Sequence, residues 1–300
     1  MLIRAATRGS PLALWQTEHV AALLRAIDPS IEIEPVVVTT TADKRLDVTI
    51  AEMGGKGVFV KEVQAAVLDG RADIAVHSAK DLPSTALEEL VIAAVPERGD
   101  PRDALVGRTL AELGPDSHVA TGSARRQAQL AHHRPGMRFS SLRGSIATRL
   151  EKASGFDAIV VAAAALDRLG LSDRAAEVLE PEVMLPQVGQ GTLAVEARAD
   201  ATDLLAVLAD IDHALSRRAL LAERAFLAEL GGDCDLPAGA YATIDGDADE
   251  VVRVDALIAT FDGSVLVRER VEARDGVAAA RSAARRLLDD RGGADLLAGR

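Results

Sequence analysis

The sequence predicts an α/β protein made of two α/β domains of similar size and a small α+β domain at the carboxyl end. Three observations lead to this prediction. Short apolar runs alternate with longer helical patterns at the start of the chain, and the same alternation resumes after a stretch rich in proline and charge. Toward the carboxyl end, strand patterns follow one another directly and one helix pattern covers them, which is typical of an antiparallel sheet.

The first α/β region begins with a strand and a well-marked helix. Ser10 stands at the N-cap position, where a side-chain oxygen accepts from the backbone, and Pro11 occupies the first helical position, where its missing N–H does no harm. The expected elements are strand Ile3–Thr7, helix Leu12–Ile27, strand Ile33–Thr39, helix Val58–Leu68 and strand Asp73–His77. Their alternation favours a layered domain with parallel strands.

The second α/β region follows a linker-like stretch, Pro96–Arg102. Its expected elements are strand His118–Thr121, helix Arg125–His133, strand Arg138–Ser141, helix Ser145–Lys152 and strand Ala158–Ala163. Pro186–Gly191 marks another crossover, and Leu193–Ala197 is one more strand.

The carboxyl-terminal region opens on a long helix pattern. Its expected elements are helix Asp212–Leu230, strands Ala238–Ile244, Val251–Thr260 and Ser264–Val271, and helix Val277–Asp289. We predict three domains with these bounds: residues 1–96 with 192–210, residues 97–191, and residues 211–300.

The composition excludes several classes of protein. A net charge of −12 argues against a general nucleic-acid binder, whose surface is basic. No apolar run approaches the roughly 18 residues that cross a bilayer, and the first residues do not resemble a secretory signal. The single cysteine forms no internal disulfide, which fits a reducing compartment. We therefore expect a cytoplasmic protein with no membrane partner, and nothing in the sequence suggests an oligomer rather than a monomer.

Three turns share one design, in which a strand is followed by a short polar turn and a helix with arginine near its start. They are the turns that contain Arg8 and Ser10, Ser123 with Arg125 and Arg126, and Arg143 with Ser145 and Arg149. A helix N-terminus favours an anion, so arginine there needs another reason, and an anionic ligand supplies one. The alternative is that each arginine pairs with a nearby Asp or Glu. Three such turns in two matching regions favour the ligand.

Two further segments offer cations at expected turns. Lys80 and Asp81 follow the strand Asp73–His77, at the strand end where ligands gather in open α/β sheets. From spacing alone, a surface ion pair that contributes little energy is an equally good interpretation of these two residues. The stretch 54–57 lacks the spacing of a phosphate loop, and we expect a flexible glycine loop that carries Lys56.

Cys234 lies between glycines and aspartates, in Leu230–Pro237. Most lone cysteines are buried, but these neighbours make burial less favourable. The aspartates also disfavour a thiolate, so a thiol that reacts once and stays modified fits better than a cycling nucleophile. The six histidines show no metal-ligand spacing with Cys234, and we expect no metal.

The sequence resembles the porphobilinogen deaminase (hydroxymethylbilane synthase) family along essentially its whole length. The stretches that carry the resemblance are Arg8–Gln16, Gly54–Gly57, Ala72–Asp81, Glu97–Asp103, Arg125–Gln127, Ser141–Gly144, Arg149, Arg168–Leu171, Val188–Gly191 and the Cys234 loop. The resemblance implies two periplasmic-binding-protein-like α/β domains with a cleft between them, plus a small α+β C-terminal domain that bears the cysteine.

The resemblance also implies the chemistry and the residues that perform it. Cys234 would carry a dipyrromethane cofactor through a thioether, and Asp81 would be the catalytic carboxylate in the condensation of four porphobilinogen molecules, followed by hydrolytic release of hydroxymethylbilane. The other implied cofactor-binding residues are Lys80, Asp81, Ser123, Arg125, Arg126 and Ser145. The implied substrate-binding residues are Arg8, Ser10, Arg143, Arg149, Arg168 and Gln190.

Several positions depart from the usual family pattern. Gly122 removes a hydroxyl donor, Ser145 replaces an asparagine, and Asp233 stands where glycine normally precedes the cysteine. Thr41 and Ala42 replace a segment that carries an arginine, and Glu52 occupies a place that is lysine in some members. None of these changes touches Arg8, Asp81 or Cys234.

Two alternatives remain at this stage. A non-catalytic anion-binding protein of the periplasmic-receptor type would share the two-domain cleft, but it should have a signal peptide and no need for Cys234. A Schiff-base lyase that uses Lys80 would be trapped by borohydride at Lys80 and would leave Cys234 unmodified.

Overall fold

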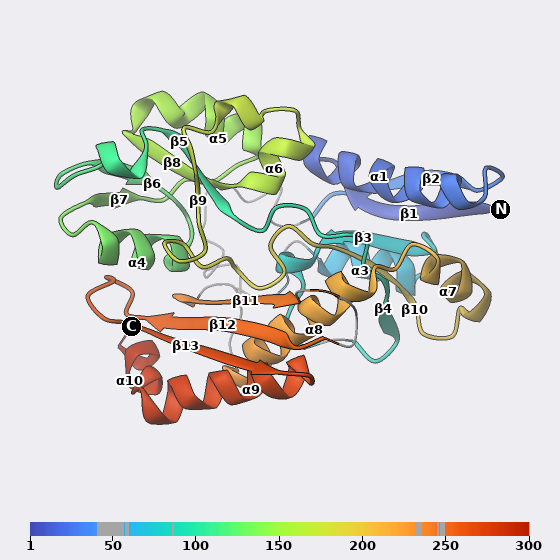
Figure 1. Ribbon diagram of the computed structural model, residues 1–300. Coiled ribbons are helices and arrows are strands. Elements are labelled where there is room, and N and C mark those ends of the chain that lie inside the picture. Colours follow the sequence, from blue (N-terminus) through green and yellow to red (C-terminus); the bar gives the residue numbers. More distant parts are fainter. Residues whose placement is uncertain are drawn as a thin grey trace. The chain divides into compact units, whose positions relative to one another are not determined.

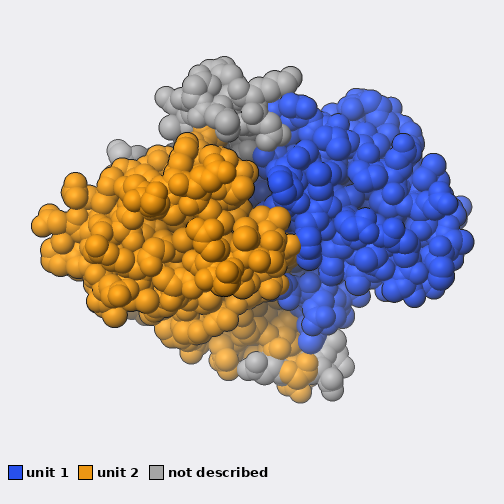
Figure 2. Space-filling view, turned by 90° about the horizontal axis from the view of Figure 1, so that it is seen from above, with its two compact units in different colours: residues 1–99, 192–217 blue, residues 100–191, 218–300 orange. Residues whose placement is uncertain are grey.

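The computed structural model describes residues 1–40, 57, 60–85, 87–231, 236–244, 246 and 250–299. The chain divides into two compact units, which Figure 2 colours separately. Unit 1 holds residues 1–99 and 192–217, and unit 2 holds residues 100–191 and 218–300. The three-domain division expected from the sequence stays a prediction. The chain passes from unit 1 to unit 2 inside the linker-like stretch Pro96–Arg102.

Unit 1 contains a five-stranded sheet in the order β2-β1-β3-β10-β4. Its elements are β1 (Leu2–Arg8), α1 (Pro11–Ile27), β2 (Glu32–Val38), α3 (Lys61–Leu68), β3 (Ile74–Ser78), β4 (Leu90–Ala94), β10 (Leu193–Arg198) and α7 (Thr202–Ala209). One apolar cluster of the sheet includes residues of α1 and α7, and another includes residues of α3 (Figure 1). The first helix begins as expected, because Ser10 accepts the N–H of Ala13 at 3.3 Å and Pro11 follows it.

The first sheet of unit 2 has five strands in the order β7-β6-β8-β5-β9. Its elements are β5 (Asp103–Gly107), β6 (His118–Ala120), α4 (Ala124–His133), β7 (Arg138–Ser140), α5 (Ile146–Lys152), β8 (Ala158–Ala162), α6 (Ala163–Arg168) and β9 (Glu177–Leu179). β8 is buried along its whole length, as its unbroken apolar sequence predicts for a central strand.

The two five-stranded sheets share one topology. In each, three strands run parallel and the next strand runs antiparallel to both of its neighbours. The antiparallel strand is β10 in unit 1 and β5 in unit 2; β10 is the first strand after the chain returns to unit 1, and β5 is the first strand after the chain enters unit 2. The parallel strands expected from the sequence are thus present in both sheets, and one further strand in each runs the other way, because strand direction depends on where the chain returns and not on local pattern.

The sequence assigned no strand to three short elements that complete these sheets. They are β4, β5 and β9. β5 and β9 are five and three residues long. Their length alone does not explain this, because β6 and β7, with three residues each, were expected from the pattern.

The carboxyl-terminal part of unit 2 is an antiparallel sheet, β11-β12-β13, as the sequence predicted. Its elements are α8 (Ala214–Glu229, of which residues from 218 on belong to unit 2), β11 (Ala238–Ile244), β12 (Val252–Ala259), β13 (Leu266–Ala273), α9 (Gly276–Arg285), a π-helical turn (Arg286–Asp290) and α10 (Gly293–Ala298). α9 runs along β12 and β13 (Figure 1).

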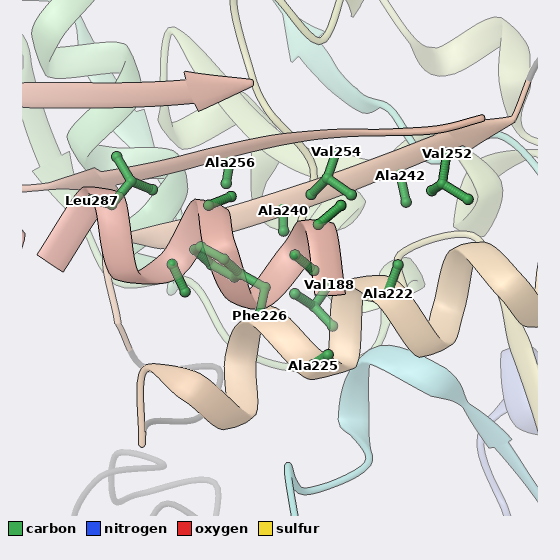
Figure 3. Close-up of a cluster of buried hydrophobic side chains, with 14 of the residues drawn as sticks. Val188, Ala222, Ala225, Phe226, Ala240, Ala242, Val252, Val254, Ala256 and Leu287 are labelled. Carbon is green, nitrogen blue, oxygen red and sulfur yellow. The ribbon is translucent and has the colours of Figure 1, made fainter. Parts of the chain in front are cut away.

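Small side chains build the core of this part. Figure 3 shows Phe226 of α8 among alanines and valines of the strands. α9 contributes a buried stripe of Ala279, Ala280, Ala283 and Ala284. Since alanine fills little space, the helix backbone approaches the sheet closely, and a core with 2% aromatic content is still filled.

The other side of the same sheet packs against α4. Ala128 of α4 and Leu185 share a buried cluster with Leu257 and Ala259 of β12. At the turn between β12 and β13, the carbonyl oxygen of Gly263 lies 3.2 Å from Nδ1 of His132 in α4. The helix that begins with Ser123 as its N-cap is thus fixed by two sheets of unit 2.

We predict that Gly263→Ala destabilises the protein strongly. The backbone at Gly263 has φ +74°, and a methyl group there would collide with the carbonyl oxygen of Ala128 and lie 2.9 Å from the Cβ of Ala131. The free energy of unfolding, measured in urea, should fall by about 2 kcal/mol or more.

Gly292→Ala is the matched control for this variant. Gly292 has nearly the same conformation, φ +72°, but a Cβ there meets nothing within 4 Å. The free energy of unfolding of this control should fall by only about 1 kcal/mol, from backbone strain alone. Equal losses in the two variants would show that the contact between the turn and α4 contributes nothing.

Candidate active site

The Lys80–Asp81 turn is anchored to the sheet of unit 1. β3 ends at Ser78 and continues into a single 3₁₀ turn, Ala79–Asp81. The N–H of Ala79 donates to the carbonyl oxygen of Thr192 at 2.9 Å, just ahead of β10. Ala79 is buried, whereas Lys80 and Asp81 are half-buried. The backbone of Ala79 therefore anchors the turn to the sheet, while the two charged residues remain accessible.

Arg8 and Ser10 lie at the same edge of this sheet. β1 and β3 are parallel, so the carboxyl end of β1 at Arg8 meets the edge that carries the Lys80–Asp81 turn. Ser10 caps α1, and Nε2 of Gln16 in α1 donates to Oγ of Ser78 at 2.8 Å. This hydrogen bond joins α1 to the end of β3, three residues ahead of Asp81.

A buried polar group supports the turn from within unit 1. Nε2 of His77 lies 3.1 Å from Oε2 of Glu196 in β10, and Nε2 of Gln64 in α3 donates to the same oxygen at 2.8 Å. All three side chains are buried. No role for these residues was predicted from the sequence, although a histidine and a glutamate within otherwise apolar strands each need a buried partner.

In unit 2 the arginine turns follow adjacent parallel strands. β6 leads to Arg125 and Arg126, β7 to Arg143 and Arg149, and β8 to α6, which ends at Arg168. The carboxyl ends of parallel strands lie at one edge, so the topology brings these five arginines to one side of the sheet. This is the grouping that an anionic ligand requires.

The two serines of these turns cap helices. Ser123 Oγ accepts the N–H of Arg126 at 3.4 Å, and Ser145 Oγ accepts the N–H of Thr148 at 3.2 Å. Replacing asparagine with Ser145 therefore keeps a good N-cap. Their predicted contacts with a cofactor remain predictions.

Arg125 and Arg126 pair with a buried aspartate, Asp103. An Nη of Arg125 lies 2.8 Å from Oδ2 of Asp103, and an Nη of Arg126 lies 2.6 Å from Oδ1. The side chains of Asp103, Arg125 and Arg126 are 0%, 2% and 8% exposed. The alternative of an arginine that pairs with a nearby carboxylate is thus correct for these two residues, and their roles toward a ligand stay predictions.

Gln190 completes this buried group. Its side-chain amide donates to Oδ1 of Asp103 at 2.9 Å and to the carbonyl oxygen of Pro101 at 2.7 Å, and its side chain is fully buried. The structure therefore places Gln190 as a support of the arginine pair. Burial alone would raise the pKa of Asp103, but Arg125, Arg126 and Gln190 hold it at about 2.

The remaining arginines differ in their surroundings. Nε of Arg149 donates to the carbonyl oxygen of Gly144 at 2.9 Å, and an Nη of Arg168 donates to that of Gly191 at 2.6 Å. Burial lowers the pKa of Arg168 to about 10, so its guanidinium is still charged at neutral pH. Arg143 and Arg149 are half-buried. Both are accessible enough to contact a ligand.

Several predicted features lie outside the described residues. They are Cys234 with Asp233, the loop cation Lys56, and the departures Thr41, Ala42 and Glu52. Asp103 was missed, although it stood within a stretch that the resemblance used. The signal was a charged residue at the head of the apolar run Ala104–Val106, which requires a buried partner.

The described part of the chain contains neither a metal-binding cluster nor a membrane-spanning helix. No group of three or more His, Cys, Asp or Glu side chains there could hold a metal ion. No described helix is long and apolar enough to cross a membrane.

Two family models match this chain. Residues 3–206 match "Porphobilinogen deaminase, dipyromethane cofactor binding domain", and residues 218–289 match "Porphobilinogen deaminase, C-terminal domain". Together with the three sheets, these matches confirm the expected α/β fold of two α/β parts and a small α+β C-terminal part.

Curated relatives match over most of their length. A porphobilinogen deaminase of Chromobacterium violaceum is 46% identical over 291 residues, which cover 95% of this chain and 93% of the relative. One of Nitratidesulfovibrio vulgaris is 45% identical, over 91% of this chain and 88% of the relative. Among solved structures, the methionine-binding protein MetQ gives a TM-score of 0.44 at 12% identity, over 70% of this chain and 88% of that chain.

We predict that Asp103→Asn changes how stability depends on pH. An aspartate has a pKa of about 3.9 in an unfolded chain, whereas Asp103 has one of about 2 in the fold. Its ionised form therefore stabilises the fold fully above about pH 4, and this contribution is lost as the pH falls toward 2. The difference in free energy of unfolding between wild type and variant should be largest at neutral pH and should shrink over that window.

Urea unfolding between pH 2 and 7 measures this difference. Asp203→Asn, which removes an exposed carboxylate in α7, is the control and should give a small and nearly constant difference. A constant difference for Asp103→Asn as well would contradict the depressed pKa.

Proposed function

Since this chain belongs to the porphobilinogen deaminase family, we propose that it joins four porphobilinogen molecules head to tail and releases hydroxymethylbilane. The observation that supports this function best is that unit 1 presents one accessible carboxylate, Asp81, at an anchored turn, and that unit 2 presents a group of arginines at one sheet edge. A cationic transition state needs the first, and a polycarboxylate chain needs the second. Neither of the alternatives raised from the sequence is favoured by the comparisons.

The residues of this chain fit a dipyrromethane cofactor. Such a group carries acetate and propionate side chains, and guanidinium groups bind carboxylates through paired hydrogen bonds. Arg125 and Arg126 add up to two positive charges against the single charge of Asp103, and Nε of Arg125 is buried with no hydrogen-bond partner among the described residues. The site therefore favours an added anion. Bound through a thioether to Cys234, the cofactor supplies the pyrrole carbon to which the first unit is joined.

Asp81 performs the chemical role in this proposal. When the aminomethyl group of porphobilinogen loses ammonia, the C–N bond breaks and positive charge develops on the pyrrole. The carboxylate of Asp81 stabilises that charge, and it receives the ring proton once the new C–C bond has formed. Lys80, Arg8 and the half-buried Arg143 and Arg149 hold the acidic side chains of the substrate, which fixes the position of the reacting ring.

The cellular setting follows from the same proposal. A substrate and product with many carboxylates need a basic site and no membrane anchor, and a thiol that must stay reduced until it is modified suits the cytoplasm. We propose a cytoplasmic enzyme that acts as a monomer. Size-exclusion chromatography with light scattering tests the monomer.

We predict that purified wild-type protein carries a covalent adduct of two pyrrole units on Cys234. Intact-mass spectrometry should show the adduct, and peptide mapping should place it on Cys234. Cys234→Ser should have the bare mass and no turnover. Borohydride reduction in the presence of porphobilinogen should add no mass at Lys80, because the mechanism needs no Schiff base. A bare wild-type chain that fails to consume porphobilinogen would sink the proposed function.

We predict that Asp81→Asn keeps the fold and the adduct but lowers turnover by about 100-fold or more, because a neutral amide neither stabilises the cation nor accepts the proton. Porphobilinogen consumption, intact mass and thermal unfolding measure the three properties. Asp69→Asn, an exposed change in the same unit, is the control and should turn over normally. Wild-type rates in Asp81→Asn would remove Asp81 from its role.

A further inference from the structure

Asp103 stands at the ligand edge of its sheet because β5 runs backwards. β5 is antiparallel to β8, and its first residue, Asp103, pairs with Ala162, the last residue of β8. A strand that ran parallel would have placed its amino end at the opposite edge. The entry of the chain into unit 2 thus delivers a carboxylate to the edge where the arginine turns gather.

The hydrogen bonds of Asp103 divide its two oxygens between the two arginines. Oδ1 accepts from Nε and an Nη of Arg126 at 2.9 and 2.6 Å, and Oδ2 lies 2.8 Å from an Nη of Arg125. Gln190 donates to Oδ1 as well, at 2.9 Å. One buried carboxylate therefore sets the position of both guanidinium groups.

The two arginines are also confined on their other sides. Arg126 donates to the carbonyl oxygen of Val160 at 3.0 Å, and Arg125 donates to that of Leu185. A Cβ added at Gly239 in β11 would lie 3.1 Å from Cδ of Arg125 and 2.7 Å from the carbonyl oxygen of Pro186. Because the space beside Arg125 is closed, the guanidinium groups are held in place before any ligand arrives.

The charge of this group is incomplete. Two guanidinium groups face one carboxylate, so the buried group has a net charge of +1. The neighbouring Asp100 does not supply the missing charge, because it forms its own ion pair with Arg102 at 2.8 Å. Within the part of the chain that the structure describes, the buried Nε of Arg125 has no hydrogen-bond partner. An uncompensated buried charge is costly, and one further anion removes that cost.

We infer that Asp103 is a positioning residue, which holds Arg125 and Arg126 in the geometry that accepts one carboxylate of the acidic cofactor or substrate. This inference rests on the proposed function. Asp103 itself does not contact the reacting atoms, since its side chain is fully buried between the arginines and Gln190. It acts through the arginines, by fixing their orientation and by leaving the buried group with one positive charge, which a single anion neutralises.

The test compares Asp103→Asn with Asp103→Glu at a temperature where circular dichroism shows each variant folded. The asparagine keeps the shape and removes the charge, and the glutamate keeps the charge and moves it by one methylene. Losing a charge-assisted hydrogen bond to the ligand should raise the KM for porphobilinogen about tenfold or more in Asp103→Asn. The fraction of chains that carry the adduct should fall in the same variant, and kcat per loaded chain should change much less than KM.

Asp73→Asn is the matched control. Asp73 also binds an arginine, Arg4, at 2.7 Å, but it stands before the amino end of β3, at the edge opposite the Lys80–Asp81 turn. Its loss should lower thermal stability and leave KM and adduct loading unchanged. Gly239→Ala gives a measurement that leaves Asp103 in place. It should raise KM by displacing Arg125, and it decides the matter where neither Asp103 variant folds.

The outcomes separate this inference from the proposed function. If the wild type is active and carries the adduct, a folded Asp103→Asn variant whose KM and loading stay within twofold of the wild-type values would overturn the positioning role. An unchanged KM in Gly239→Ala would overturn it as well. An inactive, unloaded wild type would instead overturn the proposed function. A KM that rises in Asp103→Asn and not in Asp73→Asn supports the positioning role, because a merely structural carboxylate would lower stability alone.

Discussion

The ion pairs of Asp103 with Arg125 and Arg126 are the interaction on which unit 2 depends. They connect the first residue of β5 to the start of α4, and Gln190 ties the same carboxylate to the chain segment that leads toward β10. Breaking one partner of a buried pair leaves a charge without compensation, which destabilises a protein far more than the loss of a surface pair. The same three side chains carry the charge that the proposed ligand would meet, so the proposal makes stability and binding depend on one group.

Small residues allow the parts of unit 2 to approach this group. Gly239 leaves space for the stem of Arg125, and Gly263 lets the turn between β12 and β13 rest against α4. Alanines on α9 let that helix lie close to the other face of the same sheet (Figure 3). A protein with 2% aromatic residues thereby reaches close packing through short contacts between backbones and small side chains.

The two units contribute different chemistry from one topology. Each has a sheet in which one strand, β10 in unit 1 and β5 in unit 2, runs antiparallel to both of its neighbours, and each places its polar residues where parallel strands end. Unit 1 presents Lys80 and Asp81 on a turn that the N–H of Ala79 anchors to Thr192. Unit 2 presents the arginines. A carboxylate for the cation and guanidinium groups for the acids suit the family's substrate, a pyrrole with acidic side chains.

The sequence by itself determined the local elements and the identity of the accessible residues. Ser10 and Pro11 mark the start of α1, Ser145 marks that of α5, and Lys80 with Asp81 marks the end of a strand, because caps and turns depend on a few neighbouring residues. The family resemblance added the prediction that Cys234 anchors a cofactor. Only the tertiary structure decided that β5 and β10 run backwards, and that Asp103 is buried between two arginines. Strand direction and burial depend on residues far apart in the chain, and the energy of a charge depends on what surrounds it after folding.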